Sequence, residues 1–350
     1  MSPNGLRWSE RDFMNIRKML ISPVLLTLMD LAQAGEYSVP IFDVAKAYPG
    51  KTLLTDVSRH WEQKIVEVDF NGDVAWQHTP SLPQRGLLLD ASYLANGHIL
   101  FTAKGMGIVE IDRQGRVHWE HKDAEASHDA DRLDNGNTLY NRSWVAKGED
   151  VVREISPSGQ LVWSWNGVAA FDVPPYNNVN DEGWMHVNAV SRMPNGNTLI
   201  SIRNFNIIVE VNSSGDVVRR WSFGCDPCRT IPTKGRIKGQ RNHEPELLAN
   251  GNILVALRSP FRFVEFDPET EQIKWQWRPA DSKVNMSFNR DANRLPNGNT
   301  LVTTANQVIE VTPDGTVVWL LQGPSRTSTG DPRVFHKALR SGQDGRIHGD

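Results

Sequence analysis

The chain has 350 residues, of which 39% are hydrophobic and 23% are charged, and its formal net charge is −3. This composition is ordinary for a folded globular protein and argues against a chain that is disordered throughout. The small net charge, without long runs of one sign, argues against a protein that binds nucleic acid through a basic surface. No apolar stretch reaches the roughly 18–20 residues that a membrane-spanning helix needs.

The N-terminal segment differs from the rest of the chain and predicts export. Basic residues precede an apolar run from Met19 to Met29, and the small-x-small sequence that ends at Ala34 is typical of a signal-peptide cleavage site. We therefore expect residues 1–34 to be a signal peptide or N-terminal extension, and residues 35–350 to be a single folded domain that is periplasmic or secreted. An amphipathic helix packed on that domain is the alternative for the first segment.

The only two cysteines, Cys225 and Cys228, lie close together in the sequence. In an exported protein this pair is suited to a disulfide that closes a small loop. In the cytosol the same spacing would indicate a redox motif or half of a zinc site. No second Cys-x-x-Cys or Cys/His pair completes a zinc site, so we expect a disulfide and no metal.

A repeat runs through the chain and predicts its secondary structure. A turn of Asn-Gly type recurs, each time followed by a short apolar run, and we expect both central residues of this hairpin turn to adopt positive φ. A second hairpin follows each first one, and its last strand ends in tryptophan. The turns are Pro49-Gly50, Asn96-Gly97, Asn135-Gly136, Asn195-Gly196, Asn250-Gly251 and Asn297-Gly298, and the tryptophans are Trp76, Trp119, Trp163, Trp221, Trp275 and Trp319.

Two hairpins in a period of roughly 40–50 residues correspond to one four-stranded blade, so the repeats predict an all-β protein, a six-bladed β-propeller of antiparallel blades. The segment from Phe335 to Ile347 echoes the first hairpin, and we expect it to complete the first blade and close the ring. The tryptophans are expected to pack between blades. The same role is expected for the recurring residues Asp131, Arg132, Asn293 and Arg294.

Polar residues recur where the first strand of each blade should face the central channel. In a hairpin, a position eight residues before the turn glycine lies nearly opposite a position seven residues after it, so these residues should meet at one mouth of the channel. His186 should share a face with Asn188, because side chains alternate along a strand. Histidines and cations from different blades predict an anion-binding site. The first position holds His128, Asn188, His243 and Arg290, and the second holds Lys104, Arg203 and Arg258.

Two acidic residues follow histidines of this set. Asp129 comes directly after His128, and Glu244 comes directly after His243. Asp129 is expected to orient a neighbouring histidine, and Glu244 is expected either to do the same or to hydrogen-bond the backbone of the next blade.

This part of the sequence resembles the core of bacterial arylsulfate sulfotransferases. The resemblance is carried by the run from Gly183 to Val190 and by the run from Met193 to Asn204, and it extends over roughly residues 40–345. Members of that family are six-bladed propellers that move a sulfuryl group between phenols without a nucleotide donor. The sequence looks like a shorter branch that lacks the N-terminal β-sandwich domain of the larger members.

The resemblance implies roles for individual residues. His243 would be the nucleophile that is transiently sulfurylated. Thr303 or Thr304 would add a further polar contact, the cysteine pair would correspond to a short-loop disulfide, and the protein would be exported. The residues that would hold the sulfate ester and the departing phenolate oxygen are His128, His186, Asn188 and Arg203.

The chemistry suits these residue types. Sulfuryl transfer needs in-line positioning and cations around the equatorial oxygens, and Arg203 offers a planar fork for two oxygens. A neutral imidazole is a competent nucleophile, and a second histidine can move the proton of the phenol. We therefore expect a ping-pong aryl sulfotransferase with an aryl sulfate donor, a phenolic acceptor, no cofactor and no nucleotide. Lys104, Arg258, Arg290 and Thr304 are expected to contact the substrate.

Two other functions are compatible with the same fold. A non-catalytic propeller would bind a ligand or a partner protein through the same mouth, although it would not require three histidines. The run from Asp267 to Trp275 has the look of a quinoprotein dehydrogenase repeat. Those enzymes usually have more blades, adjacent cysteines and a calcium site. The donor, the acceptor, the oligomeric state and the histidine that attacks first stay open at this stage.

Overall fold

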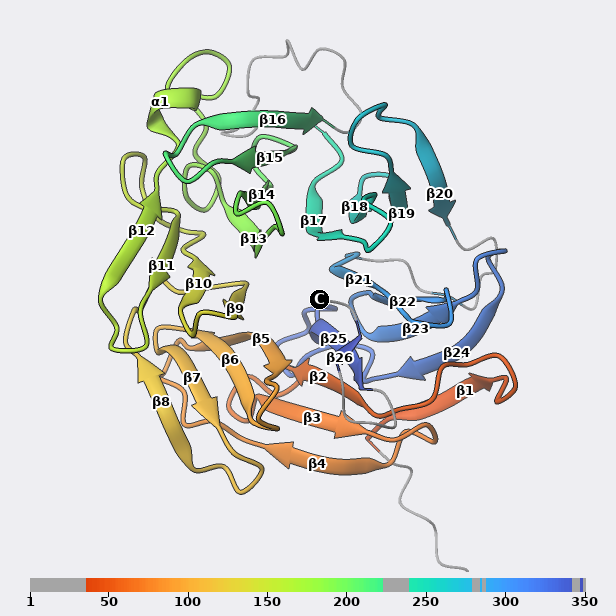
Figure 1. Ribbon diagram of the computed structural model, residues 1–350. Coiled ribbons are helices and arrows are strands. Elements are labelled where there is room, and N and C mark those ends of the chain that lie inside the picture. Colours follow the sequence, from red (N-terminus) through yellow and green to blue (C-terminus); the bar gives the residue numbers. More distant parts are fainter. Residues whose placement is uncertain (1–35, 223–238, 279–283, 285–287, 342–346, 349–350) are drawn as a thin grey trace, which may run out of the picture. The chain divides into compact units, whose positions relative to one another are not determined.

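The computed structural model describes residues 36–222, 239–278, 284, 288–341 and 347–348, and these residues form six antiparallel sheets arranged as the blades of a β-propeller (Figure 1). The predicted fold class is thereby confirmed. Strands follow one another within a blade from the central axis outward, which is the order that consecutive hairpins produce. Residues 35–350 belong to one compact unit. The predicted signal segment, 1–34, lies outside the described residues.

Blades two to five are each built from four consecutive strands. The innermost strand comes first in the sequence of each blade, and the tryptophan strand comes last. A single short helix, α1 (Val168–Phe171), follows blade three in the described part of the chain. The strands are β5 (Leu87–Tyr93), β6 (Ile99–Lys104), β7 (Gly107–Ile111) and β8 (Val117–His121); β9 (Ala130–Arg132), β10 (Thr138–Asn141), β11 (Val152–Ile155) and β12 (Leu161–Trp165); β13 (Val187–Arg192), β14 (Thr198–Ile202), β15 (Ile207–Val211) and β16 (Val217–Ser222); and β17 (Asn242–Leu247), β18 (Ile253–Arg258), β19 (Phe261–Phe266) and β20 (Ile273–Trp277).

Both ends of the described chain take part in closing the ring. A C-terminal strand forms the inner part of blade one by pairing with β2, as the sequence predicted, and an N-terminal strand adds a fifth, outer strand to blade six. Blade one contains β2 (Thr52–Asp56), β3 (Lys64–Val68), β4 (Val74–His78), β25 (Phe335–Ser341) and β26 (Ile347–His348), and blade six contains β21 (Asp291–Arg294), β22 (Thr300–Thr303), β23 (Gln307–Val311), β24 (Val317–Gln322) and β1 (Ser38–Phe42).

The Asn-Gly turns connect the strands as predicted but adopt a different turn geometry. In each turn only the glycine has positive φ, for example 82° at Gly97, whereas Asn96 is not left-handed. Gly97 N–H donates to Leu94 O, and the Asn96 side chain accepts from His98 N–H at 3.0 Å. This is a type I turn followed by a left-handed glycine, so our expectation of two positive φ values was wrong.

The repeated tryptophans link neighbouring blades, as predicted. Each indole N–H donates to a backbone carbonyl in the outer turn of the next blade, and the sixth bond returns to blade one. A repeated hydrogen bond of this kind fixes both the spacing and the tilt of adjacent blades. The pairs are Trp76–Arg113, 2.8 Å; Trp119–Pro157, 2.8 Å; Trp163–Ser213, 3.0 Å; Trp221–Pro268, 2.9 Å; Trp275–Pro313, 3.0 Å; and Trp319–Phe70, 2.9 Å.

An arginine–glutamate pair recurs between blades beside these tryptophans. Arg132 donates to Glu110 at 3.0 Å, and its guanidinium lies 4.4 Å from the Trp119 ring centroid. Arg294 makes the equivalent contacts with Glu265 at 2.7 Å and with Trp275 at 5.2 Å. The predicted inter-blade role of Arg132 and Arg294 is therefore confirmed.

Candidate functional site

The innermost strands place one polar residue from most blades around the same level of the channel. His128, Asn188, His243 and Arg290 stand there, as the repeat register predicted. The closed ring adds His336 from β25, which follows Phe335 as His128 follows Ser127. His336 was missed because its hairpin partner lies at the other end of the chain. The signal was present in the motif His-x-Ala, which is shared by His128-Asp129-Ala130 and His336-Lys337-Ala338.

Three histidines and a tryptophan form the centre of the candidate site. The His128 ring centroid lies 5.2 Å from that of His186 and 6.4 Å from that of His243. The half-buried Trp144 packs against His128 at 4.9 Å and His186 at 5.6 Å. The relative exposures of His128, His186 and His243 are 8%, 2% and 2%. The structure thus brings together the three histidines that the sequence singled out, and it adds an aromatic surface beside them.

Hydrogen bonds determine which ring nitrogen carries the proton in two of these histidines. His186 Nδ1 lies 2.9 Å from Glu182 O, and a carbonyl only accepts, so Nδ1–H donates and Nε2 keeps its lone pair. The hydroxyl of Ser143 donates to Val187 O, so it accepts from His128 Nδ1 at 2.8 Å. His128 Nε2 therefore also keeps a lone pair. Ser143 stands seven residues after Gly136, which is the repeat position of Lys104 and Arg203.

The other two histidines differ from this pair. Arg290 Nη1 lies 2.9 Å from His336 Nδ1, and because a guanidinium only donates, His336 accepts at Nδ1 and carries its proton on Nε2. The Nε2 atom of His243 is buried and has no hydrogen-bond partner among the described residues. A buried nitrogen without a partner needs an explanation, and here it lies at the recurring polar position eight residues before the turn glycine. It is therefore available to react with or to bind a ligand.

Bulges and left-handed residues set the orientation of these side chains. The register shifts between Val187 and Ala189 in β13 and between His243 and Glu246 in β17. His186 has φ of 49° and Glu244 has φ of 42°, which are uncommon values for non-glycine residues. The shift pairs His243 with Ala256 rather than with Arg258. Our prediction of nearly opposite positions is therefore off by two residues: the register next to the turn, where Glu246 pairs with Leu254, accounts for one, and the bulge at the inner end of the strand adds the second.

The three arginines of the set differ in how their charge is balanced. Arg203 forms ion pairs with Asp181 at 3.5 Å and with Glu182 at 3.3 Å. Arg258 donates through Nε to Asn289 O at 3.0 Å, and Arg290 donates through Nη1 to His336. Among the described residues, neither Arg258 nor Arg290 has a carboxylate partner. Within the described residues these two buried guanidiniums therefore make no direct ion pair, although Asp331 and Glu244 act on Arg290, and Glu182 on Arg258, from a greater distance.

Burial and these cations keep the histidines neutral. Burial, followed by the charges of Arg258 and Arg290, holds the pKa of His243 well below its usual range. Burial and Arg203 do the same to the pKa of His186, and burial with His186 lowers the pKa of His128. Burial and Arg333 lower the pKa of Arg290 to about 9. The site is therefore electropositive but has neutral imidazoles, which suits an anionic ligand and a nitrogen nucleophile.

The other residues predicted to contact the substrate differ in how close they lie to the histidines. Asn188 donates to Asn242 O at 2.9 Å, next to His243, and its side-chain oxygen is unpartnered. Lys104 Nζ lies 4.0 Å from the Trp144 ring centroid, so it reaches the edge of the site. The Thr304 hydroxyl contacts Gln307 O within its own hairpin at 3.4 Å. The structure thus brings Asn188 and Lys104 to the histidines, whereas the Thr304 hydroxyl is engaged locally.

The carboxylates beside the histidines bind a lysine in the described structure. Lys337 Nζ lies 2.5 Å from Asp129, 3.1 Å from Glu244 and 3.4 Å from Asp90. Asp129 also accepts from Val190 N–H in the next blade at 2.7 Å. Asp129 therefore contacts Lys337 and the backbone of the next blade, whereas the sequence had led us to expect that it orients a histidine. Glu244 serves as a partner of Lys337.

Other features of the chain bear on a cofactor or a second site. The predicted disulfide between Cys225 and Cys228 lies outside the described residues. Within the described ranges, no group of three or more His, Cys, Asp and Glu side chains is arranged to hold a metal ion. The same part of the chain contains no helix with the length and apolarity required to cross a membrane.

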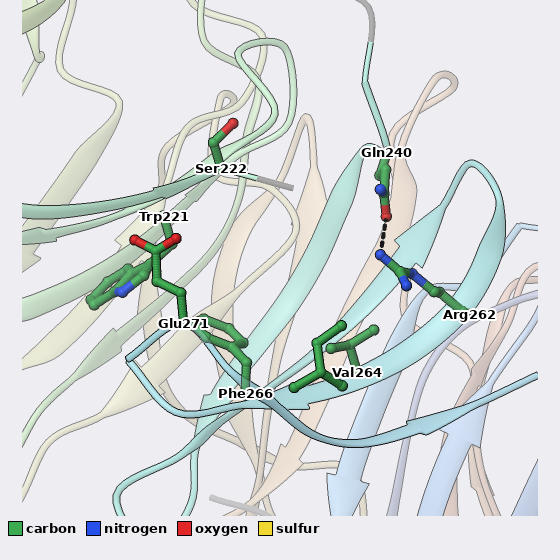
Figure 2. A pocket seen from close by; sticks show the side chains of 8 residues that line it. Trp221, Ser222, Gln240, Arg262, Val264, Phe266 and Glu271 are labelled. Carbon is green, nitrogen blue, oxygen red and sulfur yellow. Dashed lines mark hydrogen bonds between the residues drawn. The ribbon is translucent and has the colours of Figure 1, made fainter. Parts of the chain in front are cut away.

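A separate pocket of about 200 Å³ lies on the outer strands of blades four and five (Figure 2). Trp221 of β16 and Phe266 of β19 contribute its apolar side, and Arg262 donates to Gln240 at 3.0 Å across its rim. The described lining contains no histidine and no nucleophilic pair. The histidine cluster in the channel is therefore the better candidate for chemistry.

The fold and the polar ring together define a six-bladed β-propeller with a cationic, histidine-rich channel. Residues 42–226 match the family model described as arylsulfotransferase (ASST), and the chain belongs to this family. The match includes His128, His186, Asn188 and Arg203. The candidate nucleophile His243 lies beyond it, so its place in the site rests on the geometry described above. Membership supports an aryl sulfotransferase function in general terms.

Solved structures show the same fold at low sequence identity. A protein of unknown function from Bacteroides caccae has a TM-score of 0.62 at 18% identity, over 83% of this chain and 98% of that chain. A streptogramin B lyase has a TM-score of 0.52 at 13% identity, over 89% of this chain and 93% of the other. Likeness at these identities concerns the fold alone. Among curated proteins, no significant match is found.

Proposed function

We propose that the protein is an aryl sulfotransferase that works by a ping-pong mechanism, independently of a nucleotide donor, through a sulfohistidine on His243. The observation that carries the proposal is the unpartnered, buried Nε2 of His243, in a neutral ring near two further histidines and two uncompensated arginines. Family membership supports the reaction class. The aryl sulfate donor and the phenolic acceptor follow from that class.

In the first half-reaction, His243 Nε2 attacks the sulfur of the donor. The N–S bond forms as the S–O bond to the ring breaks, and the electron pair of that bond leaves with the phenolate oxygen. Arg258 and Arg290 neutralise the sulfuryl oxygens and stabilise the departing oxygen, because preorganised cations act strongly in a buried site. Arg203, held by Asp181 and Glu182, has a positioning role near His186.

In the second half-reaction, the acceptor phenol attacks the same sulfur and the N–S electron pair returns to His243. The proton of the phenol goes to a histidine that has a free lone pair, which His128 and His186 both offer at Nε2. General base assistance of this kind typically contributes about 10²–10⁴-fold in rate. Trp144 offers its ring as a stacking surface for the aryl group, since it packs on both bases.

The test uses the full chain with 4-nitrophenyl sulfate, with and without phenol, followed by intact-mass measurement. We expect phenol-dependent turnover, a stoichiometric burst of 4-nitrophenolate without phenol, and a mass increase of one sulfuryl group. His243→Asn should lose the adduct and about 10³-fold or more of kcat. His60→Asn, at an exposed histidine, is the matched control and should behave as wild type.

Two outcomes contradict parts of this proposal. An adduct that persists in His243→Asn places the nucleophile on another histidine. A folded wild-type protein that gives neither turnover nor adduct with several aryl sulfates would instead be an anion-binding propeller without transfer activity.

We also propose that residues 1–34 direct export and that Cys225 and Cys228 form a disulfide outside the cytoplasm. The basic lead and apolar run support the first part, and the short cysteine spacing supports the second. The intact mass of protein recovered from the periplasm or medium, with and without reduction and alkylation, tests both. An uncleaved chain with two alkylatable thiols before reduction would contradict them.

A further inference from the structure

Four residues on one side of the site form a connected, positively charged group. His243 lies in β17 and His336 in β25, Arg290 directly precedes β21, and Arg258 ends β18. Arg258 is tied to this group by Asn289 O at 3.0 Å, directly before Arg290, and Arg290 is tied to His336 at 2.9 Å. These contacts connect blades five, six and one on one side of the channel.

The two guanidiniums of this group keep most of their donors free. A guanidinium has five N–H groups. Within the described residues, Arg258 uses only Nε and Arg290 only Nη1, and the buried atoms Arg258 Nη2 and Arg290 Nε are unpartnered. Arg258 is 8% exposed and Arg290 is 5% exposed. His336 adds an Nε2–H donor of fixed tautomer. The group therefore holds unpartnered buried donors, and no carboxylate of the described residues contacts its guanidiniums.

Two neighbouring arginines, in contrast, form ion pairs with carboxylates. Arg203 is balanced by Asp181 and Glu182, and Arg333 is balanced by Asp331 at 2.8 Å. Uncompensated buried charge is costly. Burial and Arg290 accordingly lower the pKa of Arg258. Two neighbouring buried guanidiniums without a direct ion pair among the described residues therefore indicate a ligand that supplies negative charge.

The proposed reaction supplies only half of that charge. A sulfate monoester carries one negative charge, and the attack of a neutral imidazole leaves the total charge of the reacting atoms at one negative charge throughout. One of the two guanidinium charges would then stay unbalanced. Guanidinium forks bind carboxylates and sulfates in a bidentate manner, which matches the free donors.

We propose that the group of Arg258, Arg290 and His336 holds a second anion beside the sulfuryl group, and that the preferred substrates are aryl sulfates with an additional anionic ring substituent such as a carboxylate. That these ligands are substrates rests on the proposed function, whereas the anion subsite itself concerns binding alone. It also assigns His336 as a contact residue that donates through Nε2–H.

The first experiment measures equilibrium binding, so it does not depend on catalysis. The probes are 3-carboxyphenylmethanesulfonate and its analogue 3-carbamoylphenylmethanesulfonate, which keeps the sulfonate but lacks the second negative charge. In both, CH₂ replaces the bridging oxygen, so no sulfuryl transfer is possible. With the full chain, calorimetry should show at least tenfold tighter binding of the carboxylate probe. Equal affinities of the wild-type protein for the two probes would overturn the proposal without any variant.

Variants then locate the preference. In Arg290→Met we expect the affinity ratio of the two probes to fall to about one, whereas Arg290→Lys should keep part of it, because the charge remains and the fork is lost. Arg220→Met, on the exposed edge of β16, is the matched control and should keep the full ratio. A preference that survives in folded Arg290→Met and Arg258→Met would place the second anion elsewhere and overturn the proposal.

Turnover separates this inference from the proposed function. The substrates are 3-carboxy-4-nitrophenyl sulfate and 3-carbamoyl-4-nitrophenyl sulfate, and we expect at least tenfold higher kcat/KM for the first. Transfer from both substrates at equal kcat/KM, together with equal binding of the two probes, refutes the subsite and leaves the sulfotransferase intact. Preferential binding of the carboxylate probe without any transfer supports the subsite and refutes the sulfotransferase.

Discussion

Three of the four buried histidines of the site are held by hydrogen bonds of two different kinds. His128 and His186 donate through Nδ1 to protein oxygens and keep Nε2 as an acceptor, whereas His336 accepts at Nδ1 and donates at Nε2. The first two are suited to receive a proton and the last to hold an anion. Residues of one type therefore acquire different chemistry from their hydrogen-bond partners.

The neutral state of these rings leads to a prediction on pH. Because burial and neighbouring cations lower the pKa of His128, His186 and His243, all three stay unprotonated at and somewhat below their usual value of about 6.5. The value of kcat/KM for 4-nitrophenyl sulfate should stay constant from about pH 8 down through 6.5 and fall only at lower pH. Steady-state kinetics in buffers of constant ionic strength measure this profile.

A variant shows whether the arginine causes the shift. Arg258→Met removes a positive charge that acts on His243, so the pKa of His243 should rise and the loss of activity should move to higher pH. A wild-type profile that already declines at or above pH 6.5 would contradict the neutral cluster.

At the scale of strands and blades, one interaction unit is repeated with different burial. The tryptophan of one blade stacks on an arginine of the next, and that arginine pairs with a glutamate of the first blade. Arg192 pairs with Glu154 at 2.6 Å, where its side chain is 23% exposed. Arg340 pairs with Glu310 at 3.3 Å, where both side chains are fully buried. The same arginine–glutamate pair should therefore contribute differently to the free energy of unfolding in different blades.

This difference predicts unequal effects of the same substitution. Arg340→Met should lower the free energy of unfolding by about 3–5 kcal/mol, because it leaves Glu310 buried without its cation and removes the stacking on Trp319. Arg192→Met is the matched control at a more exposed pair and should cost roughly 1 kcal/mol or less. Urea unfolding followed by tryptophan fluorescence measures both, and equal losses would show that burial does not decide the effect.

At the scale of the whole ring, closure depends on the C-terminal strand β25 of blade one. β25 pairs with β2 and contributes Phe335 and Arg340, which are 0% exposed, together with His336 at the site. β26, by comparison, pairs with β25 at only two positions. The C-terminal strand β25 is therefore part of both the fold and the candidate site.

Two truncations test the role of this strand. Deletion of residues 335–350 should abolish cooperative folding, because it removes β25 together with β26 and leaves the apolar side chains of β2 and β22 that pack on β25 uncovered. Deletion of residues 342–350 retains β25 and is the matched control, for which we expect a cooperative transition with Tm lowered by no more than roughly 5 °C. Thermal unfolding measured by circular dichroism compares them. A cooperative transition in the shorter protein would refute this view of closure.

Local chemistry allowed much of the fold to be predicted. The spacing of the turns and tryptophans predicted four strands per blade, six blades and the closing role of the C-terminal segment, because hairpins form from residues that are near in sequence. The repeat register also predicted His128, His243 and Arg290 at one level of the channel. It failed at the fine register, where bulges displace Arg258 from the position opposite His243.

What the sequence by itself determined is the set of blades and the residue types that face the channel, since both depend on short-range periodicity. Only the tertiary structure decided which charges are balanced: Arg203 meets Asp181 and Glu182, Arg258 and Arg290 meet no described carboxylate, and Lys337 takes up Asp129 and Glu244. It also brought His336 to Arg290 across the ring closure. The physical reason is that these contacts join residues far apart in sequence, and their charges and tautomers depend on burial and on partners from other blades.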